Sequence, residues 1–398
     1  MIPPGESKSI LWTITQSRSF HNDPNAFITT RLRKYESSII RVNLLYRDIA
    51  IVSRYEDVRN LFLLEGASST GYEDLIADFF KQPNLLLQDR ETGEWKAWRR
   101  EWEQIITEID VSSIPSIIHD GLCDGDIYRT MKNLSQRLID HMFGIQTQSL
   151  QKDIFRGQFS IPVGVNTRIF QSGRSRGLAA VETLHKQISQ NLGSCPYLQR
   201  TTLPEENQSR HVLMFTSSLV VKAVASLLSA TVLHLSDKRL LKHIHSSADP
   251  QSILRSIMLE CERLSPPIIG CVRRATRPVR LGGVEIPQGW DLWSYFVAAN
   301  RDAAIYSSPD TFQYDRFLSD IPEPLTFGYG AKHCLGRELV REIVMEVLSQ
   351  VSVCGISHTP LSRDVQYWLG LSPIQASGIK QLPTQRPRLP ITVSFTNT

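Results

Sequence analysis

The feature that most constrains the fold is a long apolar stretch near the middle of the chain, HVLMFTSSLVVKAVASLLSATVLHL, residues 211–235. Its 3.6-residue period predicts one helix of about seven turns. This helix would be apolar on nearly every face, so we expect it to run through the centre of the fold. Its most apolar part, near residues 219–235, is broken by Lys222, Ser226, Ser229 and His234, and it falls short of the roughly 20 apolar residues that span a bilayer. We expect a soluble, cytoplasmic protein without a membrane anchor.

The remaining patterns predict a fold that is mainly α with small β-sheets. No internal repeat and no low-complexity linker divides the chain, so we expect a single domain over residues 1–398. Several helical patterns between 110 and 210 cannot be placed with defined bounds. Strand patterns occur in 38–53 and 280–297, and helical patterns occur in 23–36, 55–64, 93–106, 237–264 and from 337 onward.

Charge and cysteine usage narrow the functional classes. The formal net charge is +4, and no dense run of Lys and Arg occurs, so we do not expect the chain to bind nucleic acid. Its six cysteines are scattered and form no CxxC pair. This spacing predicts reduced thiols rather than a disulfide framework or a zinc site.

One cysteine has distinctive surroundings. Cys334 lies in FGYGAKHCLG, residues 327–336, directly before a helical pattern. We expect the helix N-terminus to lower the pKa of the thiol through its dipole and free N–H groups. We expect Gly330 and Gly336 to allow a tight turn around the sulfur, which a Cβ at either position would obstruct. With Phe327 covering the loop, this arrangement suits a thiolate that donates electron density to a haem iron.

The same loop resembles the haem-binding signature of the cytochrome P450 family, F-x-x-G-x-x-x-C-x-G. The matching residues are Phe327, Gly330, Cys334 and Gly336. The resemblance implies the cytochrome P450-like fold, a haem b cofactor and Cys334 as the axial ligand of its iron.

Other segments resemble the family in the same order along the chain. Glu260 and Arg263 match its E-x-x-R, and their spacing of three puts both side chains on one helical face. DTFQYDRF, residues 310–317, resembles the element whose arginine completes a buried triad, which here is Arg316. The resemblance runs from about residue 38 to 383 and is weakest between 110 and 210.

The resemblance also implies partners for the anionic haem propionates. In the family, these partners are a W-x-x-x-R pattern on one helix, an arginine on a later strand and the residue two positions before the cysteine. The corresponding residues here are Trp95 and Arg99, Arg274 in RRAT, and Lys332. We expect the neighbouring Arg273 and His333 to be solvated or merely packed.

The central helix departs from the family pattern. Most monooxygenases of this family carry an acid followed by an alcohol there, which relay protons during oxygen activation. The matching segment LVVKAVA, residues 219–225, contains no Asp, Glu, Ser or Thr. The remaining candidates for a catalytic role are Ser217, Ser218 and Lys222. We expect Lys222 to reach an edge of the fold or pair with a carboxylate, and the alternative is that it faces the cavity and binds an acidic substrate or donates protons.

The expected walls of the substrate pocket are mostly apolar, which predicts a largely apolar small molecule as substrate. The wall residues are Phe79, Leu219, Val220, Ile268, Ile269, Ile374 and Gln375.

Three functions remain open. The first is a haem-thiolate monooxygenase of specialised metabolism with atypical proton delivery, a monomer that receives electrons from a ferredoxin-like or flavin-containing partner. A basic face would suit an acidic partner, and its residues are Lys96, Arg100, Lys332 and Arg337. The second is a redox-neutral or peroxide-using isomerase, dehydratase or cyclase. The third is a haem-binding protein without catalytic activity.

Overall fold

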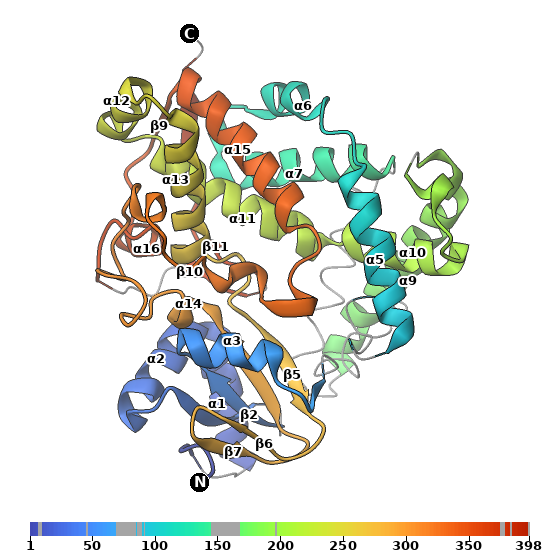
Figure 1. Cartoon of the computed structure of the whole chain (residues 1–398), viewed down its shortest axis with the longest axis vertical. Coiled ribbons are helices and arrows are strands. Elements are labelled where there is room, and N and C mark those ends of the chain that lie inside the picture. The colour runs from blue at the N-terminus through green and yellow to red at the C-terminus, as the bar shows by residue number, and fades with distance from the viewer. Residues whose placement is uncertain are drawn as a thin grey trace.

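The structure is a computed structural model that describes residues 1–6, 10–44, 47–68, 85, 90, 92–144, 168–195, 197–374, 379–382 and 384–396. Figure 1 shows a β-sheet with the first helices at the N-terminal end and a larger group of helices beside it. The class predicted from the sequence, mainly α with small β-sheets, is confirmed.

The largest sheet contains five strands in the order β1-β2-β8-β5-β3. The pair β1–β2 is antiparallel, as the hairpin pattern in 38–53 predicts, whereas β2 pairs with β8 in parallel. Strand alternation sends side chains to both faces, and both faces are covered. Phe27 of α2 packs with Ile40 and Val42 on one face, and Val58 of α3 packs with Ile39 on the other. The elements of this part are α1 (Ile10–Asn22), α2 (Pro24–Tyr35), β1 (Ile39–Leu44), β2 (Arg47–Val52), α3 (Tyr55–Leu63), β3 (Ala67–Ser68), β5 (Gly270–Ala275) and β8 (Asp291–Tyr295).

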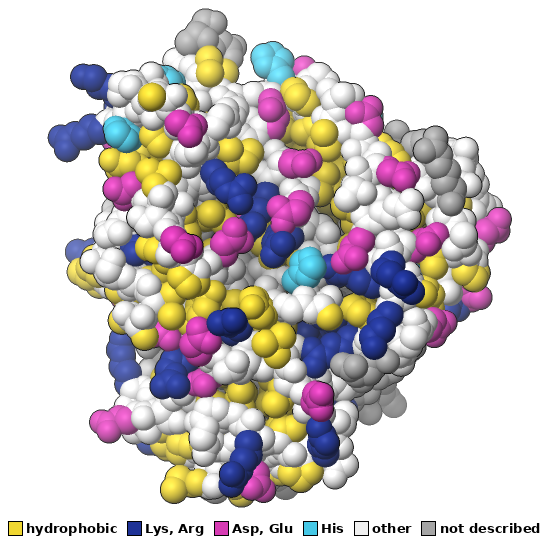
Figure 2. All heavy atoms as spheres, viewed as in Figure 1, with side chains coloured by type: hydrophobic (Ala, Val, Ile, Leu, Met, Phe, Trp, Pro, Cys, Tyr) yellow, Lys and Arg dark blue, Asp and Glu magenta, His cyan; other side chains and the backbone are white. Residues whose placement is uncertain are grey.

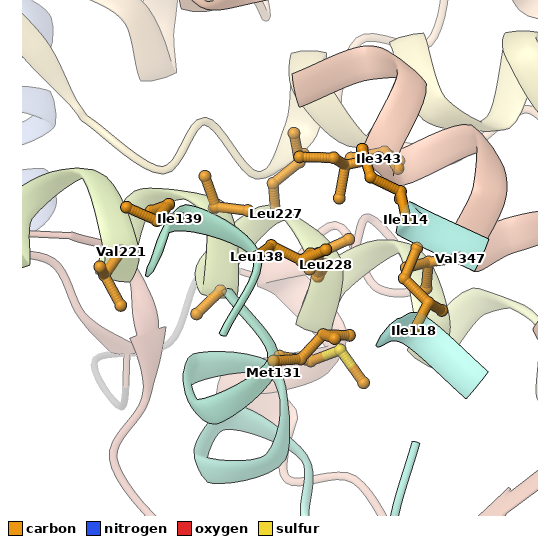
Figure 3. Close-up of a cluster of buried hydrophobic side chains, with 14 of the residues drawn as sticks. Ile114, Ile118, Met131, Leu138, Ile139, Val221, Leu227, Leu228, Ile343 and Val347 are labelled. Atoms are coloured by element: carbon orange, nitrogen blue, oxygen red, sulfur yellow. The ribbon is translucent and has the colours of Figure 1, made fainter. Parts of the chain in front are cut away.

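The helical part surrounds α11 (Ser218–His234). This helix packs against α7 (Ile127–Phe143), α13 (Pro250–Leu264) and α15 (Arg337–Cys354). Figure 3 shows this packing: Leu227 and Leu228 of α11 lie among Leu138 of α7, Ile118 of α6 (Ile114–Gly121) and Val347 of α15. The expectation of a central apolar helix therefore describes α11 well.

The expectation of one continuous helix over residues 211–235 is wrong. The structure contains α10 (Glu205–Phe215) and α11, separated at Thr216 and Ser217. The Thr216 hydroxyl donates to the carbonyl oxygen of Val212 at 2.9 Å, and Ser217 has extended backbone angles of φ −61° and ψ 150°. Hydroxyl side chains compete with the helical backbone hydrogen bonds, which explains a break within the run Thr-Ser-Ser.

The segment from Glu205 to His234 is long and apolar enough to cross a membrane by composition alone. Within the fold, 65% of its most apolar window is buried. This burial matches the core position of α11.

The structure also contains further helices and short strands. They are α5 (Gly93–Thr107), α9 (Arg168–Asn191), α12 (Lys238–Ser246), α14 (Phe296–Ala299) and α16 (Arg363–Trp368), with the short strands β4 (Gly125–Asp126), β6 (Val279–Leu281), β7 (Val284–Ile286), β9 (Ile356–His358), β10 (Ile379–Lys380), β11 (Arg386–Pro387) and β12 (Thr392–Phe395). Of these, α5, α12, β6 and β7 lie where the sequence patterns predict them.

Candidate functional site

The loop that carries Cys334 is held by its own backbone. The Cys334 N–H donates to the Phe327 carbonyl oxygen at 2.7 Å, and the His333 N–H donates to the Gly330 carbonyl oxygen at 3.0 Å. The helix α15 begins at Arg337, immediately after the loop. Gly330 has φ +69°, and a Cβ there would lie 3.1 Å from a methyl group of Leu63. Glycine is therefore required at 330, as the sequence predicts.

Gly336 has a different role from the one expected. Its φ of −86° is open to any residue, and a Cβ added there would meet no described atom within 4 Å. The expectation that Gly336 relieves a crowded turn is wrong. Gly336 lines a cavity, so a side chain at this position would occupy space inside that cavity.

This cavity has a volume of about 370 Å³ and lies between the Cys334 loop, α5, α7 and α11. Cys334 is exposed on its wall. Most of the wall is apolar, with contributions from Leu138, Phe143, Phe215, Leu219, Val220 and Val224. A thiol at the edge of an apolar space of this size is typical of a buried ligand site.

The pKa of Cys334 differs from the expectation. Burial among protein atoms raises the pKa of this thiol, while the Gly336 N–H and the charges of Arg99 and Arg337 lower it without offsetting the burial. The helix N-terminus therefore does not by itself produce a thiolate here. A coordinated metal ion would do so, because a coordinating thiol loses its proton outright.

Arg99 connects α5 to the cysteine loop. Its guanidinium donates to the carbonyl oxygen of His333 at 2.8 Å, lies 3.1 Å from the Nε2 atom of the same residue, and pairs through Nε with Glu103 at 2.6 Å. Arg99 and His333 both line the cavity. His333 is therefore part of the cavity wall, against the expectation that it is only solvated or packed.

Trp95 and Lys332 lie together on the cavity wall, as the resemblance implies for residues near the propionates. The Trp95 indole N–H donates to the Leu85 carbonyl oxygen at 3.0 Å, so this donor is already engaged. The Lys332 ammonium lies 5.3 Å from the centroid of the Trp95 ring, within cation–π range.

Arg274, which the resemblance implies as a propionate partner, does not lie on the described cavity wall. Arg274 pairs with Asp291 at 3.0 Å and is not among the described residues that line the cavity. Arg273 lines it instead, together with Cys271 two positions earlier in β5. Adjacent strand residues point to opposite sides. The sequence contains both arginines, but only the register of β5 decides which one enters the cavity.

The wall composition fits a haem. Cys334 offers a soft sulfur ligand, the apolar side chains match the porphyrin face, and Arg99, Arg273 and Lys332 match two propionate groups. Gly336 keeps the adjoining space free of a side chain.

On the α11 side, Ser217, Leu219 and Val220 line the cavity, whereas Lys222 does not. Burial lowers the pKa of Lys222 to about 6, and the positive charges of Arg386, Lys132 and Lys380 add to this effect. Lys222 is not among the described residues that line this cavity, and its role as a proton donor or as a partner of an acidic substrate stays a prediction. The side chain of Ser218 lies outside the part that the structure describes.

The expected substrate walls are only partly correct. Leu219 and Val220 line the cavity, but Ile268 does not, Ile269 is buried against the sheet, and Ile374 is 64% exposed. Phe79 and Gln375 lie outside the described residues. The sequence analysis did not anticipate the apolar wall that α7 contributes through Leu138, Ile139, Met142 and Phe143. The residues of this wall lie between 110 and 210, where the sequence shows helical patterns but does not define their bounds.

Glu260, Arg263 and Arg316 meet in the interior. The Glu260 carboxylate accepts from Arg263 at 2.7 Å and from Arg316 at 3.0 Å, and all three side chains are buried. Arg263 also donates to the carbonyl oxygens of Asn300 and Pro309, which ties α13 to the segment before the cysteine loop.

A second buried pair was not anticipated. Glu262 pairs with Arg341 of α15 through two hydrogen bonds of 2.8 and 2.9 Å. Burial raises the pKa of Glu262, and its hydrogen bonds with Arg341 act in the opposite direction. This pair connects α13 to the helix that begins directly after the cysteine loop.

The structure contains a cysteine loop at a helix start, an apolar cavity and a buried Glu-Arg-Arg triad, and these are the features that the family resemblance implies. Residues 251–351 match the family described as Cytochrome P450. This matched segment, which contains Glu260, Arg263 and Cys334, is similar to the cytochrome P450 family.

Similar proteins support the same family. Cytochrome P450 26A1 of Gallus gallus is 28% identical over 240 residues, which is 48% of this chain and 48% of that protein. Steroid 21-hydroxylase of Sus scrofa is 35% identical over 102 residues, 25% of this chain and 21% of that protein. The alignments with the P450 26A1 proteins therefore span only about half the length of those relatives.

Solved structures match over the whole chain. Retinoic acid-bound cyanobacterial CYP120A1 has a TM-score of 0.81 at 18% identity and covers 100% of this chain and 99% of its own. P450EX alpha (CYP152N1) with myristic acid has a TM-score of 0.76 at 15% identity and covers 100% of both chains. At these identities the match shows the fold.

Proposed function

We propose that the protein is a haem-thiolate monooxygenase that acts on a largely apolar small molecule in specialised metabolism. The observation that carries this proposal is the position of Cys334 on the wall of an apolar cavity that α11 also lines. In a cytochrome P450 fold, this is the geometry needed for a substrate to meet a thiolate-ligated iron.

In this proposal Cys334 ligates the iron of haem b, and Arg99, Arg273 and Lys332 bind the two propionates. When bound, the haem supplies the oxidising chemistry. The chain's own residues orient the group, exclude water and move protons. Arg99 has two tasks, because it lies on the cavity wall and also donates to the loop at His333.

The apolar walls from α7 and α11 would bind the substrate. Leu138, Ile139 and Phe143 of α7 lie on the same cavity as Leu219 and Val220 of α11. Retinoic acid and myristic acid, bound in two structures of this fold, are both long apolar molecules with one carboxylate. They support an apolar substrate class for this cavity without identifying the compound.

Proton delivery in this proposal depends on Ser217. It is 4% exposed, lies at the start of α11 and lines the cavity. Ser135 of α7 also lines the cavity, but its hydroxyl donates to the Met131 carbonyl oxygen at 2.7 Å. A water molecule bound by Ser217 would replace the acid–alcohol relay. A general acid at this place typically raises the reaction rate by about a hundred- to ten-thousand-fold.

The electron donor in this proposal is an acidic ferredoxin-like or flavin-containing protein. Figure 2 shows Lys and Arg side chains gathered over α5, where Lys96 and Arg100 are exposed. Arg337, at the start of α15, is half-buried and pairs with Glu338. A basic surface near the cysteine loop would steer an acidic partner to it. We further propose a soluble, cytoplasmic monomer.

A second candidate is a redox-neutral or peroxide-using enzyme, and the absence of carboxylates from residues 219–225 favours it. A turnover assay separates the two candidates. The monooxygenase requires dioxygen, reductant and a redox partner, whereas product formed with peroxide alone, or with no oxidant at all, supports the second candidate.

The proton pathway is tested by comparing Ser217→Ala with Ser135→Ala. We expect Ser217→Ala to lower the fraction of consumed electrons recovered in product by at least tenfold, and Ser135→Ala to change it less than twofold. Equal coupling in the two variants would rule out Ser217 as the relay.

A further inference from the structure

Glu262 is a buried acid of α13 that lies outside the Glu260 triad. Its side chain is fully buried, and its carboxylate accepts hydrogen bonds of 2.9 and 2.8 Å from Nε and Nη2 of Arg341. Arg341 belongs to α15, which packs beside α13 (Figure 1), and is itself buried. Desolvation of two charges offsets most of their attraction, so a buried ion pair is weak evidence for stability. The role of this pair therefore follows from what it contacts.

Glu262 is joined to the cysteine loop through its backbone. The Thr326 hydroxyl donates to the Glu262 carbonyl oxygen at 2.5 Å. The side-chain amide of Asn300 donates to the Thr326 hydroxyl oxygen at 2.8 Å, and the amide oxygen accepts from the Leu325 N–H at 2.9 Å. These bonds fix the two residues directly before Phe327 to the interior of the fold.

Arg341 is directed at Phe327 itself. Its guanidinium carbon lies 5.8 Å from the centroid of the Phe327 ring, within cation–π range. Because the Glu262 carboxylate binds two nitrogens of the guanidinium, the orientation of that planar group is fixed. The Phe327 carbonyl oxygen in turn accepts from the Cys334 N–H at 2.7 Å. The buried pair and the backbone of Cys334 therefore meet at one residue.

We propose that Glu262 and Arg341 are positioning residues for Cys334. The pair holds the ring of Phe327, and the Phe327 carbonyl oxygen holds the Cys334 N–H, so the sulfur keeps one direction on the wall of the cavity. Neither Glu262 nor Arg341 is among the described residues that line the cavity, so both act through the loop. The inference rests on the proposed function, in which Cys334 ligates the iron of haem b.

The test uses the full 398-residue chain loaded with haem, reduced and saturated with carbon monoxide. The measurement is the rate at which the red-shifted Soret band of the thiolate-ligated form disappears at a fixed temperature. Glu262→Gln replaces one carboxylate oxygen by an amide nitrogen that cannot accept from Arg341. Arg341→Lys keeps the charge but loses the planar donor pair that the carboxylate orients. We expect the band to disappear at least tenfold faster in both variants than in the parent.

The ion pair between Glu6 and Arg31 offers a matched control. The two residues pair at 3.3 Å, and the Arg31 guanidinium lies 3.6 Å from the centroid of the Phe27 ring. The same three groups therefore meet in the N-terminal part of the fold. We expect Glu6→Gln to lose the band at a rate within twofold of the parent.

The outcomes separate the inference from the proposed function. Absence of the band from the haem-loaded parent overturns the proposed function, and the inference falls with it. A band that the parent shows and that disappears equally slowly in Glu262→Gln and Arg341→Lys overturns the inference alone, even where urea titration shows that the two variants are less stable.

A double variant keeps the test decisive if the single variants do not fold. Glu262→Leu combined with Arg341→Met removes both charges, and apolar side chains often replace a buried ion pair without loss of stability. We expect this variant to fold and to lose the band at least tenfold faster than the parent, because Phe327 has lost its cationic contact. An unchanged rate in the double variant overturns the inference.

Discussion

The guanidinium of Arg99 donates a hydrogen bond of 2.8 Å to the carbonyl oxygen of His333, the residue directly before Cys334. Arg99 also lines the cavity and lowers the pKa of the Cys334 thiol. A single side chain of α5 therefore contributes both to the position and to the electrostatics of the proposed iron ligand.

We expect Arg99→Leu to lose most of its haem during gel filtration, because a donor to the cysteine loop and a cation of the cavity disappear together. Arg100→Leu is the matched control, since Arg100 is the exposed neighbour on the same helix. The measurement is the ratio of Soret to protein absorbance after purification. Equal ratios in the two variants would contradict the role given to Arg99.

The two arginines of β5 should behave differently. Arg273→Leu removes a cation from the cavity wall, so we expect at least a tenfold increase in the rate of haem transfer to an acceptor such as apomyoglobin. Arg274→Leu breaks the pair with Asp291, which lies away from the described cavity wall, and its transfer rate should stay within twofold of the parent. Faster haem transfer from Arg274→Leu than from Arg273→Leu would instead support Arg274 as the propionate partner, as the family resemblance implies.

Cys334 is the proposed axial ligand, so its replacement should change the spectrum in a specific way. The reduced protein with carbon monoxide should show the red-shifted Soret band of thiolate-ligated haem, and Cys334→Ala should lose this band. Cys271→Ala removes the other thiol on the cavity wall and should keep it. Persistence of the band in Cys334→Ala would refute the ligand assignment.

Glu260 should be essential for folding. Removing one partner of a buried ion pair costs about 3–5 kcal/mol, because the charges of Arg263 and Arg316 remain buried without their counter-charge. We expect Glu260→Ala to lower the free energy of unfolding by this amount in urea titration, or to prevent folding. Glu342→Ala on the exposed side of α15 should change it by less than about 0.5 kcal/mol. Normal stability with an altered substrate range would contradict the structural role of the triad.

Lys222 should make stability depend on pH. Its pKa falls from 10.5 to about 6 in the folded chain, so the unfolded chain binds more protons between these values. Stability therefore rises with pH across this window and is lost as pH falls towards 6, at most by about 1.4 kcal/mol per pH unit. The stability advantage of Lys222→Met over the parent should shrink from pH 6 to pH 9 in phosphate-free buffer. A constant difference between the two unfolding free energies would show that Lys222 titrates normally.

Local patterns explain what could be predicted from the sequence. The turn of residues 327–336 and the start of α15 depend on neighbouring residues, so Phe327, Gly330 and Cys334 indicated the loop directly. The pairing of Glu260 with Arg263 follows from helical spacing alone. The central position of α11 follows from a composition that no solvent-facing helix carries.

Relationships between distant elements decided the rest. Whether Arg273 or Arg274 enters the cavity depends on the register of β5 against β8, because a shift of one residue exchanges the two faces of a strand. The apolar wall from α7 and the direction of Lys222 depend on how α7, α11 and the β10–β11 pair pack together. These contacts join residues far apart in the chain, and their free energies are set by packing and burial that no local pattern contains.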